Sequence, residues 1–388
     1  MKPFVRLASA AMLAAAVVGA FAAPAFATSF GQGFEGHGFD DTSHRGADHV
    51  VFVQTDNPTG NAVVAYDRAP DGTLTVAATY PTGGNGGVLA GSVVDHLASQ
   101  GSLTYDDAHG LLFAVNAGSN SVSVFAARGD QLALRQIVPS FGQFPVSVAV
   151  HDNLVYVLNA RAGGSVQGYA LFGDHLFPLI GSGRVLGLNA AATPEFVNTP
   201  GQVAFSPDGT QLIVTTKANG SSIDVFHVGF FGTLSAPVVN AEPGAVPFAV
   251  TFDAAGNLAV TEAGTNAIAT FTLHHDGTLT LLHTVATTQA ATCWIVGANG
   301  RLYASNAGSA SLSRVQSGPG GALTLLDNTN TDPGTVDAAI NTHSRYLYVQ
   351  TGGNGIVDEF RINNDGSLTP IGSVTVANSI GGEGIVAI

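Results

Sequence analysis

The sequence predicts an all-β protein built as a single seven-bladed β-propeller with four-stranded blades. Three observations lead to this prediction: a β-rich unit recurs about every 44 residues, tight-turn dipeptides punctuate it, and the chain ends on an apolar run. A repeat of this length with four short strands is typical of a propeller blade. A parallel β-helix is the structural alternative, but its rungs are shorter and lack paired hairpins.

The outer hairpins set the repeat. Each consists of a β-rich run, a tight turn and a leucine that opens the next run. Turn dipeptides such as Asp71-Gly72 supply the positive φ that two-residue hairpins require. The seven leucines are separated by 44 or 45 residues, except for two steps of 58, and are Leu74, Leu132, Leu176, Leu234, Leu279, Leu323 and Leu368.

The inner hairpins number one fewer than the outer ones, because the first blade, from His49 to Tyr80, has only three strands. The apolar end of the chain, Gly384 to Ile388, is expected to supply the missing innermost strand. Pairing both ends of the chain in one blade closes the ring and removes an open sheet edge. The six inner hairpins fall at 106–110, 152–153, 207–209, 255–256, 299–300 and 342–344.

The two long steps indicate two insertions of about 14 residues, because the other steps follow the blade repeat. They lie around 82–101 and around 183–200, and both are connections between blades. In a propeller these connections share one face with the loops between second and third strands. We therefore expect function on this face, where surplus loop is concentrated.

The N-terminal segment predicts export. A short basic start is followed by an apolar run over 7–21 and by small residues that end at Ala27. Residues 1–27 are interpreted as a signal peptide, 28–47 as a flexible tail and 48–388 as the propeller. The mature protein is expected to be secreted or periplasmic and to have no membrane span. A retained membrane anchor is the alternative.

Charge and composition exclude several classes of protein. Thirteen basic against 27 acidic residues give a net charge of −14, which argues against a nucleic-acid partner. A single cysteine excludes a disulfide framework, and Cys293 beside Trp294 is interpreted as a packed thiol. We expect no metal and no other cofactor. The expected form is a monomer that binds a small molecule or carbohydrate.

The loops of the site-bearing face contain the candidate catalytic residues. Glu262 and His96 are candidates for a general base or acid. Arg161 and Lys217 are candidates for holding an anion or a developing oxyanion. Candidate ligand-binding residues on the same loops and connections are Asn116, Asn159, Gln202, Asn306 and Glu383, and the connections also carry Asp95, Glu242 and Asp332. Loops on any face need polar residues, so these positions can equally be structural.

The recurring sequence segments of the blades resemble those of the lactonase-like seven-bladed propeller family. The resemblance rests on LFAVNAGSNSVSVF at 112–125, the hairpin at 205–209 and the closing phrase at 365–372. It covers about residues 48–388 and implies a relation to bacterial 6-phosphogluconolactonases and carboxymuconate-cyclase-like enzymes. Family members resemble each other in a His-rich segment that leads into a middle blade. Residues 198–203 stand there in this chain without a histidine, so the resemblance provides no catalytic histidine.

Two hypotheses of function follow. The first is an exported hydrolase of the same bacterial family that opens a lactone or sugar-derived ester at the loop-rich face. The second is a non-catalytic propeller that binds a glycan, a small molecule or a protein there, since no catalytic motif is visible. A base and a cationic donor that face one pocket favour the enzyme, whereas charges spread around an open channel favour binding.

Overall fold

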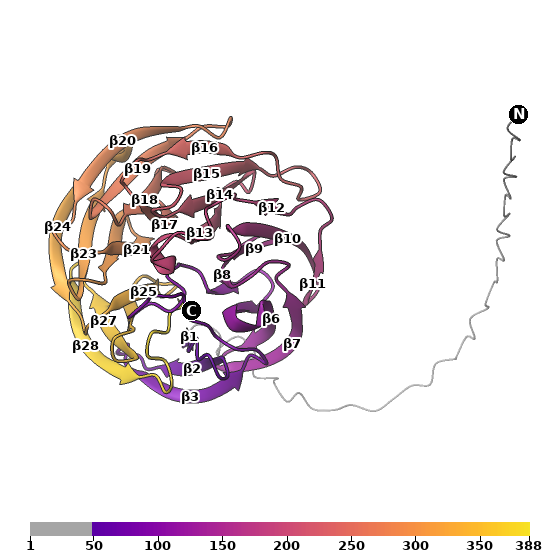
Figure 1. The fold of residues 1–388 in the computed structure, drawn as a ribbon. Coiled ribbons are helices and arrows are strands. Elements are labelled where there is room, and N and C mark those ends of the chain that lie inside the picture. The colour runs from indigo at the N-terminus through magenta and orange to yellow at the C-terminus, as the bar shows by residue number, and fades with distance from the viewer. Residues whose placement is uncertain (1–48) are drawn as a thin grey trace, which may run out of the picture. The chain divides into compact units, whose positions relative to one another are not determined.

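The computed structural model of the protein describes residues 49–388. The predicted signal peptide, the predicted tail and residue 48 of the predicted propeller lie outside the described residues. Within the described part of the chain, seven antiparallel sheets follow one another around a ring (Figure 1). The predicted all-β, seven-bladed fold is confirmed.

In each of the first four blades the strands run from an innermost position to the rim. Blade 1 contains β29 (Ile385–Ala387), β1 (Val50–Gln54), β2 (Ala62–Arg68) and β3 (Leu74–Pro81). Blade 2 contains β4 (Leu103–Asp106), β5 (Leu111–Asn116), β6 (Ser121–Arg128) and β7 (Gln131–Pro139). Blade 3 contains β8 (Pro145–His151), β9 (Leu154–Asn159), β10 (Ser165–Phe172) and β11 (His175–Pro178), with the short β12 (Arg184–Val185) also paired to β10. Blade 4 contains β13 (Pro200–Phe205), β14 (Gln211–Thr216), β15 (Ser222–His227) and β16 (Val238–Ala241).

The last three blades follow the same order. Blade 5 contains β17 (Pro247–Phe252), β18 (Leu258–Glu262), β19 (Ala267–Leu273) and β20 (Leu279–Ala286). Blade 6 contains β21 (Thr292–Ala298), β22 (Arg301–Asn306), β23 (Ser311–Ser317) and β24 (Leu323–Asn330). Blade 7 contains β25 (Thr335–Ile340), β26 (Tyr346–Thr351), β27 (Ile356–Ile362) and β28 (Leu368–Thr375). The described chain also forms three single-turn 3₁₀ helices: η1 (Ala117–Ser119), η2 (Glu195–Val197) and η3 (Pro319–Gly321).

The C-terminal strand closes the ring as predicted. Strand β29 pairs antiparallel with β1, with Val53 opposite Ile385 and Val51 opposite Ala387. The Arg68 guanidinium also donates a hydrogen bond to the carbonyl of Ile388 at 3.1 Å. The two ends of the described chain therefore complete one blade together.

The core lies between neighbouring blades, because the middle strands of each blade are covered on both faces. All six residues of β5 are buried, whereas most residues of the rim strand β7 are exposed or half-buried. This gradient explains why the second strands read as apolar runs and the fourth strands alternate. Among the described residues, no helix is long and apolar enough to cross a membrane.

The outer turns adopt the geometry that their Asp-Gly dipeptides require. Gly72 has a φ of 97°, and the Asp71 carboxylate accepts hydrogen bonds from both the backbone N–H and the hydroxyl of Thr73. The same arrangement holds Asp276 to Thr278. These aspartates stabilise turns, so they are not candidates for a site.

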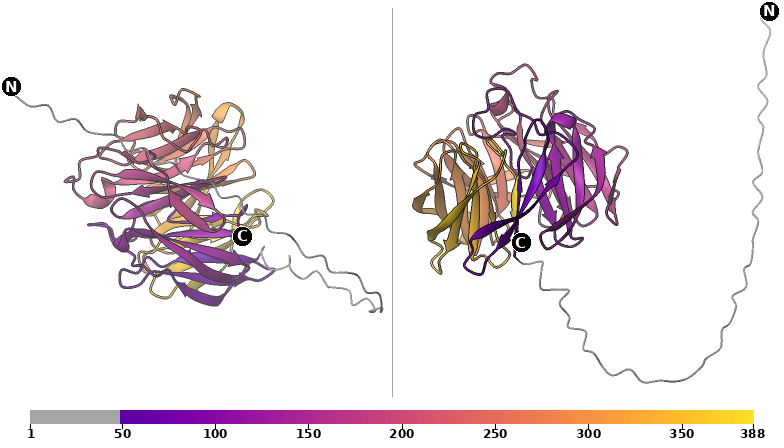
Figure 2. Two further views of the ribbon diagram at one scale, coloured as in Figure 1. Left: turned by 90° about the vertical axis from the view of Figure 1, so that its right-hand side faces the viewer. Right: turned by 90° about the horizontal axis from the view of Figure 1, so that it is seen from below.

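Both insertions lie on one face of the ring, as predicted. We call this the upper face; it also bears the loops between second and third strands. In the right-hand view of Figure 2 the insertion loops rise together from one side of the blades. They contact each other, since the backbone N–H of Ala90 donates to the Glu195 carboxylate at 2.7 Å. The two insertions therefore cover one part of the upper face. A ligand can enter this face only where they leave it open.

Candidate functional site

A segment at the end of the first insertion crosses the propeller axis. We call residues 95–101 the axial strap. Its Ser99 hydroxyl donates to the carbonyl of Val146 in blade 3, and its Gln100 N–H donates to the carbonyl of Gly201 in blade 4. From the other side of the ring, the Trp294 indole of blade 6 donates to the carbonyl of Ser99 at 2.5 Å. The strap is therefore tied to three blades and blocks the central channel.

The strap divides the channel into two cavities. The upper cavity has a volume of about 560 Å³ and opens between the loops of blades 4, 5 and 6. The lower cavity has a volume of about 430 Å³ and is lined by Gln100, Gly101 and the ends of the innermost strands on the opposite face. Of these two cavities, the upper one borders both insertions.

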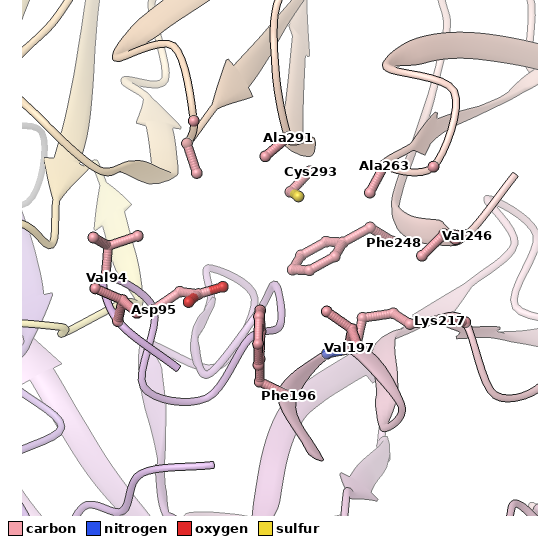
Figure 3. A pocket seen from close by; sticks show the side chains of 15 residues that line it. Val94, Asp95, Phe196, Val197, Lys217, Val246, Phe248, Ala263, Ala291 and Cys293 are labelled. Atoms are coloured by element: carbon pink, nitrogen blue, oxygen red, sulfur yellow. The ribbon is translucent and has the colours of Figure 1, made fainter. Parts of the chain in front are cut away.

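The upper cavity is walled mainly by apolar side chains. The Phe248 ring, at the start of β17, points into the middle of the cavity, and Phe196 of η2 stands beside it (Figure 3). The remaining apolar wall consists of Val93, Val94, Val197, Ala218, Val246, Ala263, Ala291 and Ala307. Such a wall favours a ligand with apolar surface, because binding removes that surface from water.

Two charged side chains of opposite sign line this apolar cavity. Asp95 comes from the axial strap, and Lys217 comes from the loop after β14. Figure 3 shows the Asp95 carboxylate directed toward the middle of the cavity and the Lys217 side chain reaching in from the opposite side. The two groups interact electrostatically without a direct ion pair between them. A polar atom of a ligand can therefore be held between a base and a cation.

The Lys217 ammonium is fully enclosed. Only 2% of the residue is exposed, and Nζ donates a hydrogen bond to the carbonyl of Ala98 at 2.5 Å. Nζ also lies 5.2 Å from the centroid of the Phe248 ring. Burial lowers the pKa of Lys217 to about 8, although the nearby carboxylates Asp95 and Glu383 oppose this shift.

The Asp95 carboxyl titrates in a range useful for proton transfer. Burial raises its pKa to about 6, while the Lys217 charge and a hydrogen bond from the Ser92 hydroxyl partly offset that rise. A carboxylate with a pKa just below neutral is ionised at pH 7 and still accepts a proton readily. Asp95 is therefore the best-placed base of the upper cavity.

Behind the cavity lies a group of buried acids. Glu383 accepts a hydrogen bond from the Ser99 N–H at 3.1 Å, its Oε1 also lies 3.0 Å from the Ser99 hydroxyl oxygen, and its own N–H donates to the Asp56 carboxylate at 2.8 Å. Burial, followed by repulsion from Asp95, Asp56 and Asp337, raises the pKa of Glu383 well above its usual value. These acids anchor the axial strap to blades 1 and 7.

Cys293 confirms the interpretation of a packed thiol. It is 8% exposed, and burial raises the pKa of its thiol. A thiol held in its neutral form is a poor nucleophile. Its role in the upper cavity is to complete the apolar wall next to Phe248.

The candidate catalytic residues lie in different places. Lys217 lines the upper cavity. Glu262 ends β18, and its carboxylate accepts a hydrogen bond from the Thr265 hydroxyl at 2.8 Å, but it is not among the residues that line the cavity. His96 follows Asp95 on the strap, and burial lowers the pKa of its imidazole, which is bonded to the backbone of Asp56. It too stands outside the cavity wall, so the structure brings Lys217 together with Asp95 rather than with Glu262 or His96.

Arg161 joins the two insertions. Its guanidinium binds both oxygens of the Glu195 carboxylate, at 2.7 and 3.1 Å, and donates to the carbonyl of Val88 at 3.2 Å. The same group stacks on the Phe144 ring, 4.2 Å from its centroid. Arg161 therefore uses its charge within the protein, where it holds the two insertions together over blade 3.

The three candidate asparagines share one role. Each ends the second strand of its blade and ties the following loop to the third strand. The Asn116 amide donates to the hydroxyls of Ser121 and Ser123 at 3.2 and 2.8 Å. Asn306 makes the same bonds to Ser311 and Ser313, and Asn159 bonds the hydroxyl of Ser165 and the carbonyl of Ser140. Their amide groups shape the upper loops.

The other two candidate ligand-binding residues lie deeper. The side-chain oxygen Oε1 of Gln202 accepts a hydrogen bond from the backbone N–H of Val250 at 2.7 Å, and the residue lines the lower cavity. Glu383 is fully buried behind Asp95. Its Oε2 is buried without a hydrogen-bond partner.

Sequence reasoning missed the apolar part of the site. Phe248 and Cys293 begin innermost strands, where apolar residues read as ordinary core. The sequence identifies Asp95 as an ionisable residue of the right connection, but nothing in it shows that the strap crosses the axis. The sequence feature that points to this site is the first insertion, because it places additional residues next to the central channel.

Comparisons with known proteins agree with this architecture. The family model described as "Lactonase, 7-bladed beta-propeller" matches residues 259–383, from β18 to the residue before Gly384. No curated protein matches the sequence. This part of the chain is similar to that family, so the predicted resemblance to lactonase-like seven-bladed propellers is confirmed.

Solved structures extend the likeness over nearly the whole ring. A proposed 6-phosphogluconolactonase from Bacteroides fragilis has 18% identity and a TM-score of 0.69, covering 89% of this chain and 99% of its own. The periplasmic gluconolactonase of Pseudomonas aeruginosa has 18% identity and a TM-score of 0.66, covering 85% and 97%. A streptogramin B lyase is more distant, with 16% identity and a TM-score of 0.53, covering 77% and 89%. At these identities the likeness establishes the fold.

Proposed function

We propose that this protein is an exported lactone hydrolase whose substrate is mainly apolar and binds in the upper cavity. One observation carries the proposal: Asp95 and Lys217 line the same apolar cavity and interact electrostatically without a direct ion pair. The family resemblance supports lactone chemistry, and the features of residues 1–27 support export.

The chemistry assigns one role to each charged group. The ionised Asp95 accepts a proton from water as the water oxygen attacks the lactone carbonyl carbon. Lys217 donates a hydrogen bond to the oxyanion of the tetrahedral intermediate. When the ring C–O bond breaks, the protonated Asp95 returns its proton to the leaving oxygen, and the product is a hydroxy acid.

The cavity wall points to the substrate class. Hydroxyl groups of a sugar lactone each need a hydrogen-bond partner when they are removed from water. Phe196, Phe248 and the valines and alanines around them offer none through their side chains. An alkyl- or aryl-substituted lactone fits this wall better than a polyhydroxylated one.

A lactone panel tests the proposal. Wild-type protein is expected to hydrolyse alkyl-substituted lactones faster than glucono-δ-lactone, measured as proton release at constant pH. Asp95→Asn is expected to lower kcat/KM by about 10² or more, because the neutral amide cannot take the proton. Asp224→Asn is the matched control, since Asp224 is also buried but bonds Ser222 in blade 4 away from the cavity.

Three outcomes would contradict the proposal. Wild-type protein that hydrolyses none of the lactones removes the activity, and equal rates for wild type and Asp95→Asn remove the assigned base. Preference for glucono-δ-lactone would contradict the substrate class.

Non-catalytic binding is the second candidate function. It is favoured by the hydrogen bond that already holds the Lys217 ammonium to the axial strap. A lactone that raises the melting temperature without being hydrolysed would support this candidate against the enzyme.

A further inference from the structure

Lysine is almost absent from this protein. The sequence has 13 basic residues other than histidine, of which Lys2 and Lys217 are the two lysines. Among residues 49–388, arginine supplies every other such positive charge, and Lys217 alone is a lysine. The single amine side chain of the described chain therefore lies in the wall of the upper cavity.

An amine at this position can do what a guanidinium cannot. Arginine stays protonated in proteins, whereas a buried lysine can lose its proton and become a nucleophile. The surroundings of Lys217 favour that state, because the Phe248 ring and the apolar wall solvate a charge poorly. The effect has the expected sign, since the pKa of Lys217 is lowered to about 8.

The position of Nζ is also suitable for chemistry. A hydrogen bond to the carbonyl of Ala98 fixes the amine, and within residues 49–388 no carboxylate forms a direct ion pair with it. Asp95 lines the same cavity and is close enough to interact electrostatically. A proton acceptor is thus available beside the amine without blocking it.

We propose that Lys217 captures aldehydes or ketones with an apolar substituent as a covalent imine in the upper cavity. The inference uses the cavity of the proposed function but does not depend on lactone hydrolysis. The carbonyl carbon of such a ligand would lie next to Nζ, with its substituent against Phe196 and Phe248.

The reaction balances without any further reactant. Asp95 takes a proton from the Lys217 ammonium, and the free amine attacks the carbonyl carbon to form a carbinolamine. The protonated Asp95 then gives its proton to the carbinolamine hydroxyl. That oxygen leaves as water, and a protonated imine remains. One ammonium and one carbonyl have become one iminium and one water, and Asp95 is ionised again.

Reductive trapping tests this proposal directly. The full chain is incubated at pH 7 with benzaldehyde and cyanoborohydride, which reduces an iminium to a stable amine, and the adducts are mapped by peptide mass spectrometry. In protein that retains residues 1–27, Lys2 and the α-amino group serve as internal references, because any amine can be labelled; in protein without these residues the α-amino group alone is the reference. We expect Lys217 to be labelled about tenfold faster than these amines, since the cavity concentrates the aldehyde beside Nζ.

The matched variant is Lys217→Arg, which retains the positive charge and removes the amine. It should lose the cavity adduct while its remaining amines are labelled as in wild type. Glyoxylate, a small charged aldehyde, is the control probe, and it should label the reference amines without preferring Lys217. An alkyl aldehyde should compete with benzaldehyde at Lys217.

The proposal is overturned if folded wild-type protein leaves Lys217 unlabelled while urea-unfolded protein is labelled there. It is equally overturned if benzaldehyde and glyoxylate label Lys217 alike. Both results depend on wild-type protein, so poor folding of the variant does not affect the test. The lactone panel is measured separately, so imine trapping without lactone hydrolysis refutes the proposed function and leaves this inference in place.

Discussion

The upper face has two halves with opposite properties. Over blade 3, Arg161 and Glu195 join the two insertions and leave a recess of only about 40 Å³ beside them. Over blades 4 to 6 the loops are short, and the cavity of about 560 Å³ opens between them. In the half over blade 3, which we call the closed half, Arg161 and Glu195 are bonded to each other. In the half over blades 4 to 6, which we call the open half, Asp95 and Lys217 lie in an apolar cavity wall.

This difference shows how little loop position alone reveals. Asn116 and Lys217 occupy comparable loops of different blades, yet the Asn116 amide N–H groups donate within their own blade whereas Lys217 reaches the axial strap. In blade 4 the loop is fastened by Thr216, whose hydroxyl bonds Ser222, so the next residue is free for another purpose. Variants of each half can therefore test whether the two halves differ in function as they differ in structure.

Filling the open half should have the largest effect. Ala263→Trp places a large ring in the wall of the upper cavity and should lower lactone hydrolysis by about 100-fold, because the substrate is displaced from Asp95. The matched change on the closed half is Ala190→Trp, at an exposed position beside the small recess. Its hydrolysis rate should stay close to that of wild type, and equal losses in the two variants would contradict the distinction.

Removing a loop amide of blade 2, outside the open half, should affect stability instead of rate. Asn116 is fully buried and bonds two serines, so Asn116→Ala should lower the free energy of unfolding by about 2 kcal/mol. Urea unfolding followed by fluorescence measures this change. Hydrolysis by the folded variant should remain within about twofold of wild type, and a selective loss of activity would return Asn116 to the ligand-binding residues.

The two charged groups of the cavity should give a bell-shaped pH dependence. Below pH 6 the rate should fall about tenfold per pH unit, because Asp95 becomes protonated and loses its function as a base. Above pH 8 it should fall again, because Lys217 loses the charge that stabilises the oxyanion. Stopped assays of kcat/KM across pH 5–9 measure both limbs. A profile that is flat through pH 6 would exclude Asp95 as the base.

The ion pair of the closed half should have the smallest effect. The side chains of Arg161 and Glu195 are 38% and 26% exposed, so water screens their attraction. Arg161→Met should therefore lower the free energy of unfolding by about 1 kcal/mol or less. Thermal unfolding is the measurement, with Arg135→Met, from a more exposed pair with Asp174, as the control. If the free energy of unfolding fell by several kcal/mol instead, the contact between the two insertions would stabilise the whole propeller.

The fold could be predicted in detail because its signals are local and repeated. Seven outer turns, each followed by a leucine, give the number of blades, and the apolar run before Ile388 gives the closure. Each of these signals depends on backbone requirements within a few residues. Repetition makes such a pattern unambiguous even where a single turn would be weak evidence.

The candidate site could be predicted only in part. The face and Lys217 follow from topology, because loops between second and third strands must lie on one side of the ring. The pairing of Lys217 with Asp95 does not follow, because it depends on the path of the axial strap, which is set by contacts to Trp294 and Ser147 far away in the sequence. The catalytic roles of Glu262 and His96 remain predictions.

A crystal structure with a bound alkyl-substituted lactam tests the central claim most directly. A lactam has the ring and carbonyl of a lactone but resists hydrolysis, so it should occupy the site as an unreacted substrate does. We predict that its carbonyl oxygen accepts a hydrogen bond from Lys217 Nζ in the upper cavity, with its alkyl group against Phe248. A lactam bound in the lower cavity, or in the upper cavity with its carbonyl turned away from both Lys217 and Asp95, would contradict the account.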